Sequence, residues 1–369
     1  MNTVTNKRKF APPKTNQRRD ELNYFNAIAC LLVILIHVLS VGIVSLDSKS
    51  LQLAAIYIPW NFAAYVVPGF LFVGAVKMAL GFNSSENTGY TKYIWKRIVK
   101  IYFPYIITSC VYFAYYYFVG WYVADPMFFL RLLFTGLIAS PFYYIVTVMQ
   151  FYLLMPLWKF TLKKIPWFTA IPISVLITFV SLRLSAFLGV FGITDVLSDR
   201  IFTTYLIFWV LGLYVGANYS KIYSAVLKHK KALLICAVPS ILFTLLNYWQ
   251  HSTGNIVFTS DISCMKVISD IMSIMLFMTI CIIIKNAKLP KLKKVLDFIF
   301  GASFSVFLSH CLFLYLADMY IIQKFGITDI GLQLIIRFVI CYTLPFLWYW
   351  LLKKVKYPVK KFFRKKKTS

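Results

Sequence analysis

The sequence has few acidic side chains and few charged side chains of either sign. It contains 12 aspartates and glutamates against 39 lysines and arginines, and charged residues make up 14% of its 369 positions. Soluble domains carry about 25% charged residues. Hydrophobic residues make up 60% of the chain, and the mean hydropathy is +0.74. This composition excludes an ordinary soluble domain and indicates an integral membrane protein.

Several motifs of nucleotide-dependent and hydrolytic enzymes are also missing. The sequence has no GxxxxGK[ST] phosphate loop, which argues against ATP-driven pumping, and no GxSxG nucleophile elbow. No cluster of His, Cys and Asp has metal-site spacing, and the seven cysteines form no CxxC pair, so we predict neither a metal nor a bound cofactor. Asp270 is nearly alone as an acidic residue inside an apolar run, which argues against a proton-coupled transporter.

Long apolar runs are what the sequence has in abundance. Runs of 18 or more apolar residues are typical of transmembrane helices, so we predict an all-α integral membrane protein with ten of them. The predicted spans are roughly 23–46, 51–80, 98–120, 140–158, 166–188, 201–219, 232–250, 264–285, 298–322 and 331–353. Asp125 followed by Pro126 is a good helix start, so a short interfacial helix is expected near 126–138.

The basic residues fall in alternate connections between these runs. If the N-terminus is cytoplasmic, most of the lysines and arginines lie on the inner side, whereas the outer connections carry aspartates. This asymmetry predicts an even number of spans with both termini cytoplasmic. Residues 1–22 then form a polar tail, 23–353 a membrane domain, and 354–369 a polybasic tail that attracts anionic lipids. Positive charge spread in this way does not indicate a nucleic-acid partner.

Ionisable residues inside apolar runs are costly and therefore mark candidate functional sites. His37 ends the stretch NAIACLLVILIH, which begins at Asn26. Eleven residues of α-helix turn through about three full turns and rise about 16 Å, so both side chains face the same way. His37 would lie in the outer half of the membrane, where a neutral imidazole can act as a general base. His310 is a second candidate, with a packed polar contact as the equally weighted alternative.

The remaining charged residues inside the apolar runs allow structural as well as functional roles. Arg97 and Lys100 lie three residues apart at the inner mouth of the third run, where they either extend to the interface or bind phosphate. Lys266 and Asp270 are spaced as an intrahelical ion pair. Arg183 and Arg337 require a partner or water, which the sequence does not identify.

Five stretches, taken together in order, resemble the acyltransferase-3 family of bacterial membrane acyltransferases. They are NAIACLLVILIH (26–37), VVPGFLFVGAVKM (66–78), YTKYIWKRIVKIYFPY (90–105), YYIVTVMQFYLLMPLW (143–158) and GASFSVFLSHCLFLYL (301–316). The stretches are most similar to the intercellular-adhesion C branch, which is associated with poly-N-acetylglucosamine.

The resemblance implies acyl transfer from cytosolic acyl-CoA to a hydroxyl of a cell-envelope glycan. On this basis His37 and His310 are the candidate catalytic residues, and Arg97, Lys100 and Asn26 the candidate donor-binding residues. The acyl group implied is acetyl or succinyl, and the location is the bacterial plasma membrane.

The sequence departs from the family pattern at two basic positions. The arginine of the first family helix is Asn26 here, and the second basic residue of the third-span motif is Lys100. An amide cannot neutralise phosphate, so another cation, such as Arg18, Arg19 or Lys77, would have to replace the missing arginine.

Two other functions remain open from the sequence. One is a polysaccharide exporter or an accessory subunit of a glycan synthase, favoured by the missing arginine and by aromatic residues that could stack on sugars. The aromatic residues are Tyr112, Tyr115, Tyr116, Tyr117, Trp121 and Tyr122. The other is a membrane scaffold that catalyses no reaction. This function is the least favoured, because it gives no reason for ionisable residues to be kept inside the membrane at a cost in free energy.

Overall fold

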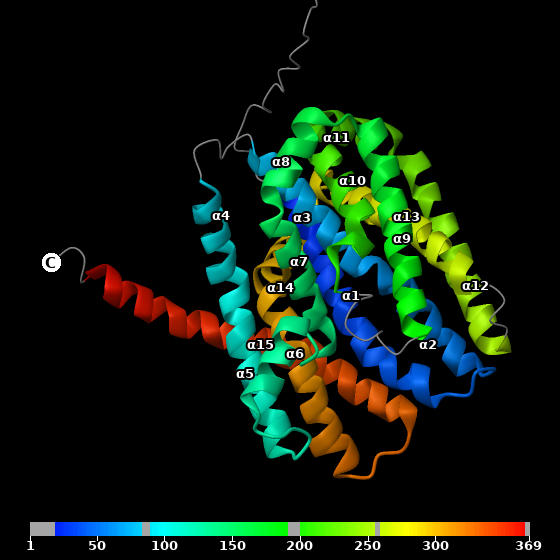
Figure 1. Ribbon diagram of the computed structural model, residues 1–369. Helices are drawn as coiled ribbons and strands as arrows, with labels where there is room; N and C mark the ends of the chain where they lie inside the picture. Colours follow the sequence, from blue (N-terminus) through cyan, green and yellow to red (C-terminus); the bar gives the residue numbers. More distant parts are fainter. Residues whose placement is uncertain (1–18, 83–88, 191–199, 255–258, 366–369) are drawn as a thin grey trace, which may run out of the picture.

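The computed structural model describes residues 19–82, 89–190, 200–254 and 259–365, and every regular element in these ranges is helical (Figure 1). The α-helices are α1 Asp20–Ser45, α2 Leu51–Phe62, α3 Val66–Phe82, α4 Tyr90–Arg97, α5 Phe103–Phe118, α6 Pro126–Thr135, α7 Tyr143–Leu153, α8 Met155–Lys164, α9 Trp167–Val190, α10 Leu206–Ala217, α11 Tyr219–Leu233, α12 Ala237–Thr253, α13 Thr259–Asn286, α14 Pro290–Ala317 and α15 Ile330–Lys365. The short 3₁₀ and π turns are η1 Ala63–Tyr65, η2 Ile98–Tyr102, η3 Ser140–Phe142, η5 Phe202–Tyr205, η6 Leu234–Cys236 and η7 Asp318–Gln323. The all-α prediction is confirmed.

Eight helical runs in the described ranges are long and apolar enough to cross a membrane. They are Asp20–Ser45, Leu51–Phe82, Tyr90–Phe118, Trp167–Ser185, Tyr219–Thr253, Met265–Asn286, Pro290–Gln323 and Ile330–Lys354. Two predicted spans are less regular. The region predicted as 140–158 belongs to a helix pair bent by 60°, and the span predicted as 201–219 is a shorter apolar helix, Phe202–Ala217. The chain is a multi-pass membrane protein, while the count of ten and the side on which each terminus lies remain predictions.

One connection differs from the sequence-based expectation. The sequence predicts an inner loop over residues 220–231, with their lysines, but these residues lie in α11, which continues through η6 into α12. The helix kinks at His229, whose φ and ψ are −105° and 18°. Apolar and aromatic residues alternate here with the lysines at helical spacing, so one side of α11 can pack against α13. The predicted short helix after Asp125 is α6, and the Asp125 carboxylate accepts a hydrogen bond from the Met127 N–H at 2.8 Å.

α1 lies at the centre of the bundle, where it packs against α2, α3, α13, α14 and α15 (Figure 1). Its buried face includes Leu22, Phe25, Ala29 and Val33, whose spacing of three to four residues places them in one stripe. Because this stripe continues toward His37, the packing of the first half of α1 fixes where the imidazole points.

α10 packs very closely against α3 because two glycines face the contact. A Cβ at Gly212 would lie 2.4 Å from the carbonyl oxygen of Phe72, and one at Gly216 would lie 2.7 Å from that of Val76. Small residues four positions apart let helix backbones approach in this way in membranes.

We expect Gly212→Ala to destabilise the protein by about 1–3 kcal/mol, because the helices must separate to admit the methyl group. Thermal unfolding of the detergent-solubilised protein measures the loss. Gly74→Ala is the matched control, since a Cβ there meets only Trp209 side-chain atoms at 3.5 Å, an ordinary contact. Equal melting temperatures for the two variants would contradict the close-packing argument.

The second apolar run is broken in its middle. α2 and α3 are joined by the 3₁₀ turn η1, with Pro59 inside α2 and Pro68 inside α3. Pro68 has no N–H, so an α-helical hydrogen bond to the carbonyl of Ala64 cannot form. Irregular backbone at membrane depth is tolerated where it is covered by protein or lines a cavity, and Ala64 and Pro68 both line the cavity described below.

A buried ion pair joins three helices at the end of the bundle where α1 begins, which we call the basic end. The Glu21 carboxylate, fully buried, lies 2.5 Å from the ammonium of Lys285. The Tyr219 hydroxyl donates a hydrogen bond of 2.6 Å to the same carboxylate. These contacts tie α1 to α11 and α13, so the start of α1 is held in place.

Candidate active site

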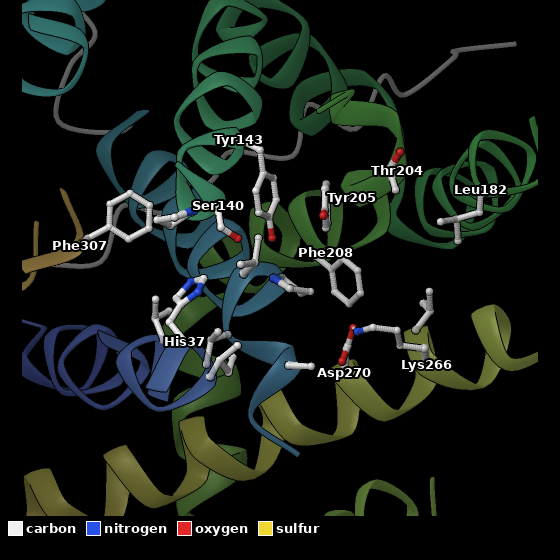
Figure 2. A pocket seen from close by; sticks show the side chains of 18 residues that line it. His37, Ser140, Tyr143, Leu182, Thr204, Tyr205, Phe208, Lys266, Asp270 and Phe307 are labelled. Carbon is white, nitrogen blue, oxygen red and sulfur yellow. The ribbon is translucent and has the colours of Figure 1, made fainter. Parts of the chain in front are cut away.

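A cavity of about 420 Å³ lies beside the half of α1 remote from the basic end (Figure 2). Its lining comes from α1, η1, α3, η3, α7, α9, η5, α10, α13 and α14, which are far apart in the sequence. The volume is in the range of small-molecule sites. Most of the lining is apolar, and the polar side chains are His37, Ser140, Tyr143, Thr204, Tyr205, Lys266 and Asp270.

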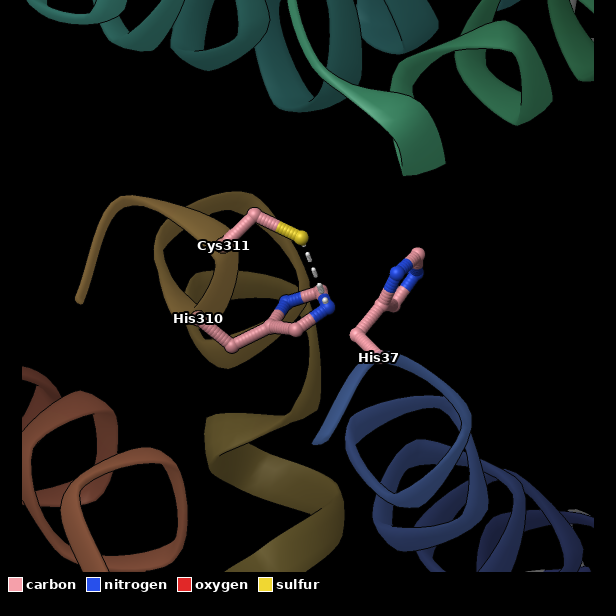
Figure 3. Close-up of side chains that lie close together, drawn as sticks. All are labelled: His37, His310 and Cys311. Atoms are coloured by element: carbon pink, nitrogen blue, oxygen red, sulfur yellow. Dashed lines mark hydrogen bonds between the residues drawn. The ribbon is translucent and has the colours of Figure 1, made fainter. Parts of the chain in front are cut away.

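His37 reaches the cavity from α1. The helix is unbroken from Asp20 to Ser45, so the predicted relation between Asn26 and His37, with a rise of about 16 Å, requires no correction for a kink. The imidazole faces the cavity and the neighbouring α14, and it does not point into the lipid (Figures 2 and 3). An imidazole beside a cavity can accept a proton from a molecule that binds there.

His310 is the second imidazole of the site. It is fully buried on α14, and its ring centroid lies 5.2 Å from that of His37. Its Nδ1 lies 3.0 Å from the carbonyl oxygens of Val306 and Phe307. Since a carbonyl only accepts hydrogen bonds, Nδ1 carries the proton and Nε2 is left with a lone pair. The structure therefore brings the two predicted catalytic histidines together.

A cysteine that the sequence did not single out completes this group. The sulfur of Cys311 lies 3.4 Å from Nε2 of His310, and the ligand atoms of His37, His310 and Cys311 all lie within 4.8 Å of one another. Linear spacing gave no sign of this cluster, because His37 lies on the first helix and the other two residues on α14. These three side chains are the group in the described ranges that could hold a metal ion.

Lys266 and Asp270 face His37 across the cavity (Figure 2). The predicted ion pair is confirmed: Nζ of Lys266 lies 2.7 Å from Oδ2 of Asp270. The carboxylate is 9% exposed and the lysine side chain 43% exposed. Burying a charge pair inside a membrane protein costs free energy, so such pairs often mark functional sites. This pair provides acceptors and donors of hydrogen bonds on the wall opposite the imidazole.

Asn26 lies near a cation at the basic end. The ammonium of Lys77 donates a hydrogen bond of 3.2 Å to the Asn23 side chain, one turn before Asn26, and lies 5.0 Å from the Phe300 ring centroid. The Oδ1 of Asn26 is buried and accepts no hydrogen bond within the described residues. Of the cations considered as substitutes for the missing arginine, Lys77 is hydrogen-bonded one turn away from Asn26, the guanidinium of Arg19 lies over the Tyr219 ring, and Arg18 lies outside the described residues.

Arg97 and Lys100 occupy different environments. The guanidinium of Arg97 lies 5.1 Å from the ring centroid of Tyr93 and 4.7 Å from that of Tyr152, and the residue is partly buried. Lys100 is exposed. The π turn η2 begins between them and has more residues per turn than an α-helix, which rotates Lys100 away from the face of Arg97. In the part of the chain that the structure covers, no hydrogen bond or ring contact joins either cation to Asn26.

The structure identifies a partner for Arg337. Its guanidinium binds both oxygens of Asp318, at 2.7 and 2.6 Å. This bidentate pair joins η7 to α15 outside the cavity, so it explains Arg337 structurally. Arg183 lies on α9 and does not line the cavity.

Four hydroxyl-bearing residues of the cavity were not predicted: Ser140, Tyr143, Thr204 and Tyr205. The hydroxyl of Thr204 is buried and has no hydrogen-bond partner in the described ranges. Ser140, Thr204 and Tyr205 lie in η3 and η5, just after connections between helices, where the sequence shows no motif, and Tyr143 is the first residue of the stretch 143–158. They lie near His37 only because the helices pack together in the folded protein.

The described helices thus form an apolar bundle in which two imidazoles lie beside a cavity that has several polar side chains. A comparison with protein families specifies the chemistry further. Residues 19–354 match the acyltransferase-3 family model, described as an acyltransferase domain, and the chain belongs to that family. The protein is thus a multi-pass membrane acyltransferase that transfers groups other than aminoacyl groups. No curated protein and no solved structure matched the chain.

Proposed function

We propose that this acyltransferase moves an acetyl or succinyl group from cytosolic acyl-CoA to a hydroxyl of an extracytoplasmic cell-surface polysaccharide, in a bacterial plasma membrane. The observation that carries the proposal is the position of His37. It borders a polar-lined cavity in the half of α1 remote from the basic end, opposite Lys266 and Asp270.

The basic end suits the donor. Coenzyme A carries phosphates, and a guanidinium or an ammonium binds phosphate oxygens. Arg97 is held between two aromatic rings and Lys77 beside Asn23, so both cations are positioned before a donor arrives. Anionic lipids would meet the exposed lysines nearby by the same attraction.

Two helices run from this end to the cavity. α1 carries Asn26 and, about 16 Å further on, His37. α7 carries Tyr152, which contacts Arg97, and Tyr143, which lines the cavity; nine residues of helix separate them by about 13 Å. The cavity lining does not include Asn26, Lys77 or Arg97, so the helices would have to part for an extended pantetheine arm to bring the thioester carbonyl to His37 while the nucleotide stays at the basic end.

The transfer needs one base at the acceptor. An acceptor hydroxyl gives its proton to a nitrogen of His37 as its oxygen attacks the thioester carbonyl carbon. The tetrahedral intermediate then collapses: the carbon–sulfur bond breaks, and the coenzyme A thiolate receives the proton from His37. The products are an ester and free coenzyme A, and His37 is neutral again.

The far wall of the cavity suits a polyhydroxylated acceptor. The carboxylate of Asp270 accepts hydrogen bonds from sugar hydroxyls, and Lys266 and the hydroxyl of Tyr143 donate them. Apolar lining residues such as Phe208 and Phe307 would cover the sugar faces. A sugar held there presents one hydroxyl to the imidazole.

Part of the aromatic group that favoured polysaccharide export lies in the protein core. It drew on the aromatic residues around 112–122, but Tyr112 and Tyr116 are buried. The Tyr112 hydroxyl donates to the Leu308 carbonyl at 3.1 Å and accepts from the Leu312 N–H at 2.7 Å, so it joins α5 to α14. These two rings are part of the core and are not free to stack on a sugar, whereas Tyr117 and Trp121 are 47% and 54% exposed.

Labelled donor and purified glycan in proteoliposomes test the proposal. With acetyl-CoA or succinyl-CoA supplied on the basic side and polysaccharide on the other, we expect alkali-labile label on the glycan. Translocation of glycan without label would support export and contradict the proposal. Empty liposomes and the His37→Ala protein give the background.

Donor binding can be tested separately at Arg97. We expect Arg97→Gln to raise the KM for acyl-CoA by about 10-fold with little change in kcat, because a charge-assisted contact made equally in the ground and transition states is lost. Lys96→Gln removes an exposed neighbouring cation and is the matched control. A KM increase of the same size in both variants would show that Arg97 contributes only general positive charge.

A further inference from the structure

The cluster of His37, His310 and Cys311 has the dimensions of a metal site. Figure 3 shows the two side chains of α14 directed toward His37 on α1. In a tetrahedral zinc site, metal–sulfur and metal–nitrogen bonds of about 2.3 and 2.05 Å place the sulfur and nitrogen about 3.5 Å apart. The sulfur of Cys311 lies 3.4 Å from Nε2 of His310. The observed sulfur–nitrogen distance therefore matches the distance between two ligands of a tetrahedral zinc ion.

The third ligand needs only a small movement. No two of the three ligand atoms are more than 4.8 Å apart. Bringing His37 to tetrahedral separation requires a shift of at most about 1.5 Å. His37 is partly accessible through the cavity, whereas His310 and Cys311 are fixed in the core at 0% and 1% exposure. Two ligands are therefore rigid, and the third closes from the side on which an ion would enter.

The surroundings also favour a metal. The Nδ1 of His310 donates to backbone carbonyls, and this leaves Nε2 free to bind a cation. A backbone partner of this kind orients most metal-binding histidines. Imidazole and thiolate ligands select Zn²⁺ over Mg²⁺ or Ca²⁺, which require oxygen ligands.

We propose that His37, His310 and Cys311 bind Zn²⁺, with the fourth position open to the cavity. This replaces the expectation of no metal, which depended on linear spacing alone. Binding exchanges the Cys311 S–H proton for the metal, so one proton is released to water for each ion bound. Three protein ligands and one open position are typical of sites that bind an exogenous ligand.

Zinc at this site would block the proposed transfer. The ion occupies the lone pair of His37 that would otherwise take the proton of the acceptor hydroxyl. The site is therefore inhibitory, and this second statement depends on the proposed function. The binding itself does not.

Direct binding measurements on the purified full-length protein test the site. We expect zinc, titrated against a chromophoric chelator, to bind with a stoichiometry of one, and Cys311→Ser to weaken binding by about 100-fold. Cys30→Ser is the matched control, because Cys30 is also buried at the α1–α14 contact and donates only to the Ser303 carbonyl. His310→Gln is a second ligand variant should Cys311→Ser be poorly folded.

Cobalt substitution provides a spectroscopic readout independent of activity. Co²⁺ should give a thiolate-to-metal charge-transfer band in wild type and Cys30→Ser and none in Cys311→Ser. Zinc bound equally well by all three proteins, or no band in the wild type, would overturn the site.

Inhibition separates the two proposals. We expect added zinc to suppress acyl transfer by the wild-type and Cys30→Ser proteins, with recovery on chelation, and not to suppress the residual activity of Cys311→Ser. A protein that binds zinc through Cys311 but transfers no acyl group under any condition keeps the metal site and rejects the proposed function. Acyl transfer that bound zinc leaves unchanged rejects the inhibitory role.

Discussion

Replacing His37 by glutamine should reduce acyl transfer to the glycan by about 10²- to 10⁴-fold, the range over which a general base accelerates a reaction. Glutamine keeps approximately the size and polarity of the imidazole but cannot take a proton at neutral pH. Because His37 lies at the cavity wall, the bundle does not depend on it for packing as it does on Leu22 or Phe25. The loss should therefore fall on kcat. Labelled ester per mole of purified enzyme measures it.

The control for this variant is His229→Gln. His229 is an exposed histidine at the kink of α11 and takes no part in the cavity. Both variants should elute as the wild type does on size exclusion and melt at similar temperatures. Wild-type ester formation by His37→Gln would remove the imidazole from the mechanism, whatever its position.

Replacing Lys285 by methionine should cost about 3 kcal/mol of stability. The change leaves the carboxylate of Glu21 buried without its counter-ion, and breaking a buried ion pair from one side is far more costly than removing both charges. Tyr219 still donates a hydrogen bond to Glu21, which moderates the loss. Thermal unfolding in detergent or nanodiscs measures the change.

The double variant Glu21→Gln with Lys285→Met separates lost charge pairing from lost volume. It should recover much of the stability, because no unpaired charge remains. Lys288→Met, at an exposed lysine three residues away, should have almost no effect. A double variant less stable than Lys285→Met would show that the charges themselves are not the source of the loss.

The sequence predicts the helical fold well because membrane insertion depends on the length and apolarity of single segments. Each long run can be recognised without its neighbours. It predicts Lys266–Asp270 for the same reason, since both partners lie on one helix and spacing alone brings them together. His37 stands out because an imidazole in an apolar run is unusual.

The sequence does not predict the contacts between helices, because it does not show which helices are neighbours. Cys311 is one small apolar residue among many until α14 packs against α1. Thr204 and Ser140 follow loops without a motif, and Arg337 lacks a visible partner until η7 brings Asp318 to it. The dense lysines of α11 favour a loop by charge alone, whereas the helical spacing of the apolar residues between them indicates the helix that forms.

The unwound turn at 63–65 lies on the cavity, and Pro68 has no N–H to offer the carbonyl of Ala64. Lipid cannot satisfy such a carbonyl, whereas a polar group in the cavity can. Under the proposed function, water admitted to the same cavity would compete with the sugar hydroxyl for the thioester. Binding the glycan before the acyl donor would then protect the thioester from hydrolysis.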